Sequence, residues 1–270
     1  MANLFKVDQE KCDQCNLCIE ACSVGLIKIG DQQNPVPIEG AAEICENCGH
    51  CVAVCPHGAL ALSTMAPEQF PLTNNDLLPA FHQIEHSFRS RRSIRAFKER
   101  RIEKEVLTKL STAANYGATG LNAQKVNWLI FSDKDKIQQL AKITSQWMLS
   151  FQKTLATSYL QRIVDQCLKM WNAGNDSMCR NAPHLVVAHS KGGGSDCTIA
   201  LTQLSLAAPA LGIGTCWSGW VKIAANNFPA MQEFLDLPEG HTCNGAMMVG
   251  YPKYKYPRIP LRNEPTLNWR

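Results

Sequence analysis

The spacing of apolar residues predicts a helix shortly after residue 100. Apolar side chains recur there every three or four positions, at Ile102, Val106, Leu107, Leu110, Ala113 and Ala114. This is the period of one helix face. Gly117 stands at the position of a C-terminal cap, so we expect the helix to end there.

Short apolar runs predict three buried strands, at residues 126–131, 184–188 and 245–249. Residues 136–172 have a mostly helical pattern, with bulk supplied by Trp147, Met148, Phe151, Leu155, Tyr159 and Leu160. Strands that are separated by helices indicate an α/β or α+β domain.

Residues 197–221 contain no Asp, Glu, Lys or Arg, and a membrane span needs about 20 apolar residues. This stretch is interrupted by polar residues, proline and glycine, at Thr198, Thr202, Gln203, Ser205, Pro209, Gly212 and Gly214. We therefore predict a buried helix followed by a buried strand, and no membrane association.

A stretch rich in proline and small polar residues marks the domain boundary. It runs from residue 64 to about residue 82 and contains Pro67, Pro71, Thr73, Asn74, Asn75, Asp76 and Pro79. Neither a helix nor a strand persists through such a stretch. The chain of 270 residues has room for a small front module and a domain of about 200 residues. The predicted division is a module at 1–63, a linker at 64–86 and a second domain at 87–270.

The formal net charge of +4 hides an uneven distribution. Residues 1–63 hold three Lys and Arg against eight Asp and Glu, whereas residues 64–270 hold 24 against 15. Solvated surface carboxylates alone would also explain the acidic part. In the basic part, the cations cluster only at 89–101 and 253–262. Two local clusters favour a bound phosphate over a nucleic-acid track, so we expect no nucleic-acid partner.

Eight of the 13 cysteines form two runs with the spacing CxxCxxCxxxC: Cys12, Cys15, Cys18 and Cys22, then Cys45, Cys48, Cys51 and Cys55. In such a run three thiolates bind one 4Fe-4S cluster, and the fourth binds the other cluster. The expected ligand sets are therefore crossed. One set is Cys12, Cys15, Cys18 and Cys55, and the other is Cys45, Cys48, Cys51 and Cys22.

Structural zinc and disulfides explain these runs less well. Zinc would need only four ligands per site in two CxxC pairs, which leaves the third cysteine of each triplet without a role. Disulfides imply secretion, but no basic n-region followed by an apolar h-region opens the chain, so we expect a cytoplasmic protein. Pro56 follows the last cysteine, while Ser23 replaces the corresponding proline of the first run. Residues 1–63 resemble a two-cluster bacterial ferredoxin domain.

A group of cations near residue 91 suggests phosphate binding. The segment 91–97 reads Arg-Arg-Ser-Ile-Arg-Ala-Phe, and guanidinium groups pair bidentately with phosphate oxygens. Taken alone, this segment fits a solvated charge run better than a phosphate site. Three further segments follow it in the chain: 120–124 with Asn122 and Gln124, 214–219, and 251–255.

The order of these four segments resembles the nitroreductase family of FMN enzymes, over roughly residues 87–262. The resemblance implies an α+β fold that binds FMN at a homodimer interface, with the helix near 197–211 as the dimer core. It implies phosphate and ribityl contacts from Arg91, Arg92, Ser93 and Arg95, and contacts to the ribityl chain and the polar ring edge from Asn122 and Gln124. It places Cys216, Trp217, Ser218 and Gly219 along the flavin ring, and Lys255 or Arg258 on the phosphate.

One departure from the family pattern follows Gln124. The family usually has Pro and Trp directly after this glutamine, whereas here Lys125 and Val126 come first and Trp128 lies further on. The three glycines at 192–194 lack the surrounding residues of a phosphate-binding motif, so we expect a turn between a strand and a helix.

The remaining polar candidates have structural explanations. We expect Cys167, Cys179, Cys197, Cys216 and Cys243 to be buried free thiols, and His184, His189 and His241 to be structural histidines with satisfied hydrogen bonds. Trp217 and Trp220 could form a wall of the substrate pocket or pack in the core. No catalytic acid or base is identified, because the flavin carries the chemistry.

These features predict an FMN-dependent oxidoreductase of an anaerobic type. Electrons would pass from a low-potential donor such as ferredoxin through two 4Fe-4S clusters to FMN, which reduces a nitroaromatic, a quinone or an activated alkene. Two alternatives stay open. One is a non-catalytic electron carrier or redox sensor, and the other is an NAD(P)H-dependent nitroreductase that uses the clusters as an electron outlet.

Overall fold

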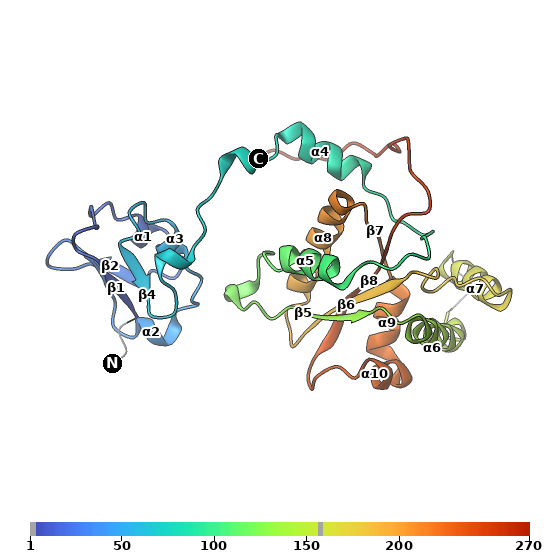
Figure 1. The fold of residues 1–270 in the computed structure, drawn as a ribbon. Coiled ribbons are helices and arrows are strands. Elements are labelled where there is room, and N and C mark those ends of the chain that lie inside the picture. The colour runs from blue at the N-terminus through green and yellow to red at the C-terminus, as the bar shows by residue number, and fades with distance from the viewer. Residues whose placement is uncertain (1–3, 156–158) are drawn as a thin grey trace. The chain divides into compact units, whose positions relative to one another are not determined.

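The computed structural model describes residues 4–155 and 159–270. The chain forms two compact units (Figure 1). The first contains the residues up to Pro79 together with Leu121–Ala123, and the second contains Ala80–Gly120 and Gln124–Arg270. The division after Pro79 falls inside the stretch 64–86, which the sequence assigns to a linker.

The first unit holds two small antiparallel sheets. Strand β1 (Phe5–Val7) pairs with β4 (Leu60–Leu62), and β2 (Ile27–Ile29) pairs with β3 (Pro35–Pro37). Three one-turn helices lie between the strands: α1 (Leu17–Glu20), α2 (Ala41–Ile44) and α3 (His50–Ala53). The pairing of β1 with β4 joins the two ends of the module around a core that includes Phe5, Cys18, Ile27, Cys51, Val52, Leu60 and Leu62.

The stretch after β4 contains little regular structure. Two short 3-10 turns, η1 (Pro67–Gln69) and η2 (Asn75–Leu77), precede helix α4 (Phe81–Ser90). No residue of α4 is buried. The helix therefore begins within the stretch predicted to be a linker.

The second unit is built on a four-stranded antiparallel sheet in the order β5-β6-β8-β7. These strands are β5 (Asn127–Phe131), β6 (His184–Ser190), β7 (Gly214–Trp217) and β8 (Thr242–Gly250). The three apolar runs predicted as strands are confirmed as β5, β6 and β8. All seven residues of β6 are buried, as expected for a strand with both faces covered.

Helices cover both faces of this sheet (Figure 1). Leu185 and Val187 of β6 belong to one core, formed with α6 (Lys134–Gln152), α7 (Tyr159–Asn172), α9 (Gly219–Asn227) and α10 (Pro229–Leu235). Val186 and Ala188 belong to the other core, formed with α5 (Lys104–Ala114), α8 (Gly194–Ala207) and the short turn η4 (Ala208–Leu211). The alternation follows from the two-residue period of a strand.

The predicted helices are present, with one change at an end. Helix α5 confirms the first, but its C-cap is Asn115 rather than Gly117. After Asn115 the N–H groups of Tyr116 and Gly117 donate to carbonyls three residues back, those of Ala113 and Ala114, so the α-helical bonding has already ended. Helices α6 and α7 confirm the helical pattern of 136–172, of which residues 156–158 lie outside the described residues. The charge-free stretch forms α8 and β7, as predicted. None of the helices in the described residues has the length and apolarity needed to cross a membrane.

Candidate functional site

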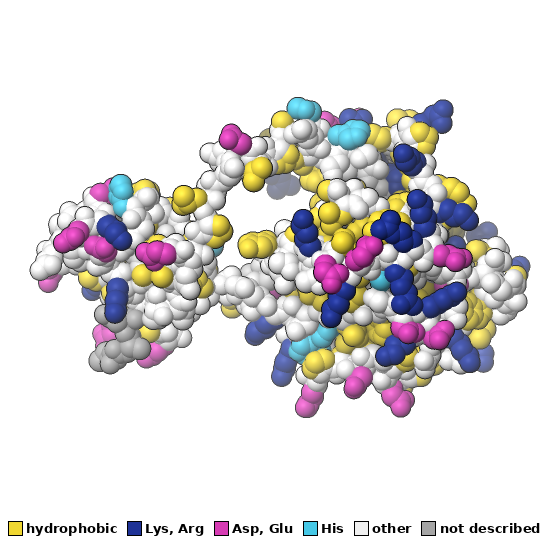
Figure 2. All heavy atoms as spheres, viewed as in Figure 1, with side chains coloured by type: hydrophobic (Ala, Val, Ile, Leu, Met, Phe, Trp, Pro, Cys, Tyr) yellow, Lys and Arg dark blue, Asp and Glu magenta, His cyan; other side chains and the backbone are white. Residues whose placement is uncertain are grey.

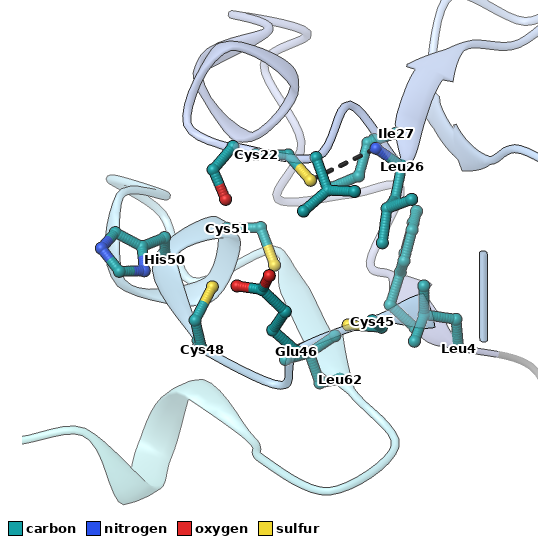
Figure 3. Close-up of a pocket in the computed structure, with 14 residues that line it drawn as sticks. Leu4, Cys22, Leu26, Ile27, Cys45, Glu46, Cys48, His50, Cys51 and Leu62 are labelled. Carbon is teal, nitrogen blue, oxygen red and sulfur yellow. Dashed lines mark hydrogen bonds between the residues drawn. The ribbon is translucent and has the colours of Figure 1, made fainter. Parts of the chain in front are cut away.

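Each predicted set of four cluster cysteines lines one cavity of the first unit. The first cavity is lined by Cys22, Cys45, Cys48 and Cys51 (Figure 3), and the second by Cys12, Cys15, Cys18 and Cys55. The fold therefore brings the last cysteine of each run to the other run. In Figure 3 the labelled sulfurs and the carboxylate of Glu46 surround the same space.

The donor chemistry of both cavities fits an iron–sulfur cluster. Four thiols line each cavity. Glu46 and His50 also line the first cavity and Asp13 the second, while most other lining side chains of the first cavity are apolar. Backbone N–H groups point at the fourth sulfur of each set: Leu26 donates to Cys22 Sγ at 3.3 Å, and Ala59 donates to Cys55 Sγ at 3.2 Å. The cavities measure about 30 and 20 Å³, the room of one or two water molecules, so side chains must move outward to admit a cluster.

Burial keeps part of this thiol set protonated in the absence of metal. It raises the pKa of the Cys51 thiol to about 11 and also raises the pKa of Cys18. Iron binds the thiolate, so ligation by these residues releases protons.

The second unit contains a larger, basic cavity of about 480 Å³, a size within the range of ligand pockets. Its cationic lining residues are Arg91, Arg92, Lys98, Lys253 and Lys255. No Asp or Glu is among the described residues that line it. Figure 2 shows many Lys and Arg side chains on the visible face of this unit. The cavity can hold a phosphate dianion and part of a larger anionic ligand.

Backbone pairing fixes the cationic segment between β7 and the C-terminal residues. The N–H of Ile94 donates to the Thr215 carbonyl at 2.9 Å, and the N–H of Lys253 donates to the Ala96 carbonyl, also at 2.9 Å. Gly214 permits this approach, because a Cβ there would clash with the side chains of Ile94 and Pro252. The first and the last predicted FMN segments, 91–97 and 251–255, therefore lie together at one end of β7.

A second group of predicted residues acts on the buried side chain of Cys216, which is 6 % exposed. Burial raises the pKa of its thiol, while the guanidinium of Arg95 and a hydrogen bond from Ser93 act in the opposite direction, as do Arg180 and Arg91. Arg91 also lines the basic cavity. This residue therefore belongs to both groups.

The end of β7 contains an unsatisfied polar atom. Ser218 is 3 % exposed, and its hydroxyl has no hydrogen-bond partner among the described residues. Ser218 is also the N-cap residue of α9 without a side-chain cap bond. Next to it, Trp217 is 40 % exposed, and a Cβ added at Gly219 would meet nothing within 4 Å. An unpaired buried hydroxyl costs free energy, so this position fits a ligand that supplies the missing partner.

The other predicted FMN contacts do not all lie at the basic cavity or at Cys216. Arg92 lines the basic cavity, but its guanidinium also donates to the carbonyls of Arg91 and Arg89 at the end of α4. Asn122 belongs to the first unit, where its amide donates to the carbonyls of Glu46 and Asn47. Gln124 has a left-handed φ of 49°. Arg258 is exposed and is not among the lining residues of the cavity, whereas Lys255 is.

The structural assignments of the remaining residues can be checked directly. His184 accepts from the N–H of Ile102 and is bonded to Ser132, and His189 is bonded to His241, as expected for structural histidines. The glycines at 192–194 form the predicted turn between β6 and α8. Trp220 packs on Trp147 in the core, while Trp217 is partly exposed. Of the five other cysteines, all free, only Cys167 is not fully buried.

Sequence patterns did not single out every residue at these sites. Lys98 and the tyrosines Tyr251, Tyr254 and Tyr256 also line the basic cavity, and the charge of Arg180 acts to lower the pKa of the Cys216 thiol. The segment 251–255 contains Tyr251 and Tyr254, and the cation cluster at 253–262 contains Tyr254 and Tyr256. The only signal for Arg180 is the polar turn that begins at Asp176.

The fold and both sites define the class of the protein. The chain belongs to the nitroreductase family, whose model matches residues 88–251. Membership makes it an FMN-dependent oxidoreductase with the α+β fold that the sequence predicts. Residues 11–59 match the model of a 4Fe-4S dicluster domain, so the chain joins a ferredoxin-type iron–sulfur domain to a nitroreductase domain.

Individual relatives resemble the second domain. A protein of Archaeoglobus fulgidus, provisionally named an NADH dehydrogenase/NAD(P)H nitroreductase, is 25 % identical over 164 residues, which are 61 % of this chain and 82 % of the relative. A nitroreductase from Desulfitobacterium hafniense with bound FMN superposes with a TM-score of 0.58 at 20 % identity, over 70 % of this chain and all of that one. Iodotyrosine deiodinase, solved with FMN and 3-iodo-L-tyrosine, gives a TM-score of 0.57 at 22 % identity, over 69 % and 98 %. The two structures establish a shared fold.

Proposed function

We propose that this protein is a cytoplasmic iron–sulfur flavoenzyme that takes electrons from a low-potential, ferredoxin-type donor and delivers them to an organic acceptor. Two 4Fe-4S clusters would be held by the crossed cysteine sets, and FMN by the second unit. The observation that carries the proposal is the gathering of each crossed set around one cavity. Bound FMN would exchange single electrons with the clusters and electron pairs with the acceptor.

The chain's own residues divide the work of holding FMN. Arg91 and Lys255 supply cations for the phosphate in the basic cavity, with Arg92 and Arg258 as further cations of the same segments. Ser93 and Arg95 lie on the Cys216 side, where the hydroxyl of Ser218 offers a free hydrogen-bonding group. Gln124, Trp217 and Gly219 complete the proposed contacts of the second unit.

The proposed acceptor class comes from the resemblance to the nitroreductase family: a nitroaromatic, a quinone or an activated alkene. The partly exposed ring of Trp217 supports it, because an aromatic acceptor can stack on such a face beside the proposed ring site.

A homodimer is the proposed assembly. Helix α8 carries no Lys or Arg and is apolar on average. One face of it is nevertheless exposed, with Ile199 at 38 %. The exposed side chains of the helix are uncharged, at Ser195, Thr198, Ile199 and Thr202, so covering this face would remove no charged side chain from water. A second copy of this chain would cover that face, and light scattering of the purified protein tests this.

Anaerobic stopped-flow measurements test the electron path. Reduced ferredoxin should reduce the flavin faster than NADH or NADPH does, and cluster bleaching should precede flavin bleaching. A nitroaromatic, quinone and alkene panel then tests the acceptor. Reoxidation of the flavin by oxygen or protein partners alone would instead indicate a carrier or a sensor.

A second candidate function keeps NAD(P)H as the electron donor and uses the clusters as an outlet to another protein. The name of the Archaeoglobus fulgidus relative favours this version. The same stopped-flow experiment decides between them, because fast flavin reduction by NADH before any cluster change would contradict the ferredoxin-type path.

A further inference from the structure

The two cysteine runs share one further feature, an acidic residue directly after the first cysteine. Asp13 follows Cys12, and Glu46 follows Cys45. Asp13 lines the second cavity and Glu46 lines the first. Each cavity therefore has one carboxylate in its wall, and the two carboxylates differ in their surroundings.

The carboxylate of Asp13 is exposed and has two partners. One oxygen accepts a hydrogen bond from the backbone N–H of Cys15 at 3.2 Å, and the other lies 3.2 Å from Nε2 of His57. The side chain of Asp13 is 47 % exposed. Water and salt therefore screen this charge.

The carboxylate of Glu46 has no such partners. The residue is half-buried, and its side chain points into the space between the labelled sulfurs (Figure 3). Its oxygens take part in no ion pair or hydrogen bond among the described residues. His50 lines the same cavity but is exposed and does not pair with Glu46. Apolar side chains form much of the remaining wall: Leu4, Phe5, Val24, Leu26, Ile27 and Leu62.

An unpaired charge in an apolar cavity acts strongly on a second charge nearby, because little water lies between them. A 4Fe-4S cluster gains one negative charge when it accepts one electron, and its potential depends on the charges, hydrogen bonds and solvent around it. The hydrogen bonds are matched, since the fourth sulfur of each set accepts one backbone N–H, from Leu26 or from Ala59. The two carboxylates are therefore the main difference in charge between the cavities.

We propose that the carboxylate of Glu46 makes the cluster of the first cavity the harder of the two to reduce. The inference rests on the proposed function, because it needs both clusters in the crossed cysteine sets. A single electron from the one-electron donor then resides preferentially on the cluster of the second cavity. The cluster of the first cavity, once reduced, is the stronger reductant.

Redox titration of the cluster-loaded protein tests this. The protein is reduced anaerobically in steps with dithionite, and the EPR signal of the reduced clusters is followed against the solution potential. Glu46→Gln removes the charge and keeps the shape of the side chain. We expect it to raise the lower of the two midpoint potentials by about tenfold in the ratio of reduced to oxidised cluster, which is about 59 mV for one electron. The higher potential should not change.

Two further variants serve as controls. Glu46→Asp keeps the charge and should keep the lower potential of the parent. Asp13→Asn removes the exposed carboxylate of the other cavity and should shift either potential less than Glu46→Gln shifts the lower one.

Three outcomes of the titration would overturn the proposal: unchanged potentials in Glu46→Gln, a rise of the higher potential instead of the lower, or an equal shift in Asp13→Asn. A loss of iron in Glu46→Gln would also overturn it, because the side chain would then be a structural support of the cluster loop. A parent protein that binds iron for one cluster only would contradict the proposed function itself, and with it this comparison of two clusters.

Discussion

The backbone N–H of Ile102 donates a hydrogen bond to Nε2 of His184 at 2.8 Å. Because Nε2 is the acceptor, the ring proton of the neutral histidine lies on Nδ1, which is 2.8 Å from the hydroxyl of Ser132. The imidazole thus ties the start of the α5 segment to strand β6. Burial, together with the nearby charge of Arg101, lowers the pKa of His184 from 6.5 to about 4.

This bond predicts acid sensitivity of the second unit. Between pH 6.5 and 4 the unfolded chain binds a proton at His184 and the folded chain does not, so stability falls as the pH is lowered through this window. Above pH 6.5 the contribution is complete. His184→Gln cannot titrate but can still accept from Ile102, so its unfolding temperature should vary less over the same range. Equal pH profiles for both proteins would contradict this assignment.

Crossed ligation predicts which pairs of cysteine substitutions act together. Cys12→Ser and Cys55→Ser each remove a ligand from the same cavity, so the double variant should contain as much iron as either single variant. Cys22→Ser with Cys55→Ser removes a ligand from both cavities and should cost nearly all the iron.

Iron analysis and EPR of the reduced protein provide the measurement. Cys167→Ser, in the second unit, is the control and should keep the full iron content. If Cys12→Ser with Cys22→Ser were instead the pair that loses only one cluster, each run would bind its own cluster and the crossed sets would be wrong.

The Arg91–Ser93 segment of the proposed flavin site can be tested without touching the clusters. Arg91→Ala with Ser93→Ala removes one cation and one hydroxyl, and each charge-assisted bond is worth about 1.5–3 kcal/mol. We expect the purified variant to retain little FMN and a normal cluster spectrum. Arg162→Ala, an exposed arginine of α7, should retain both. Loss of cluster absorbance together with FMN would mean that the two domains do not fold separately.

The unsatisfied hydroxyl of Ser218 predicts opposite effects on stability and on binding. Ser218→Ala removes a buried polar atom without a partner, so the flavin-free protein should be unchanged or about 1 kcal/mol more stable. FMN affinity should fall, because the hydroxyl is proposed to bond the flavin. Ser177→Ala, which loses a bond of 2.7 Å to the Cys167 carbonyl, should destabilise the flavin-free protein. Tighter FMN binding by Ser218→Ala would argue against a ligand at this atom.

The sequence predicted those elements whose surroundings leave a strong pattern. Strand β6 is buried on both faces, so it appears as an uninterrupted apolar run, and α8 stands out because it lacks basic residues. The eight cysteines of the first unit needed only their spacing, because short loops place the ligands of a cluster.

Other elements depend on partners that are distant in the chain. Strands β1 and β4 have three residues each, too few to show the two-residue alternation of a strand in the sequence. Their pairing joins residues far apart in the chain, with Phe5 opposite Leu62. Helices α9 and α10 are short and were not predicted. Arg180 is a single cation in the loop between α7 and β6, and the shape of that loop depends on the hydrogen bonds accepted by Asp176.

The shared use of the two cysteine runs sets an order of events during translation. The cavity lined by Cys22 and the second triplet is complete only when Cys51 has been made, and the other only when Cys55 has been made. In the proposed ligation both clusters therefore become possible within a few residues of each other, before any of the nitroreductase domain has been synthesised. The nascent chain would therefore need a supply of iron–sulfur clusters before it could bind flavin.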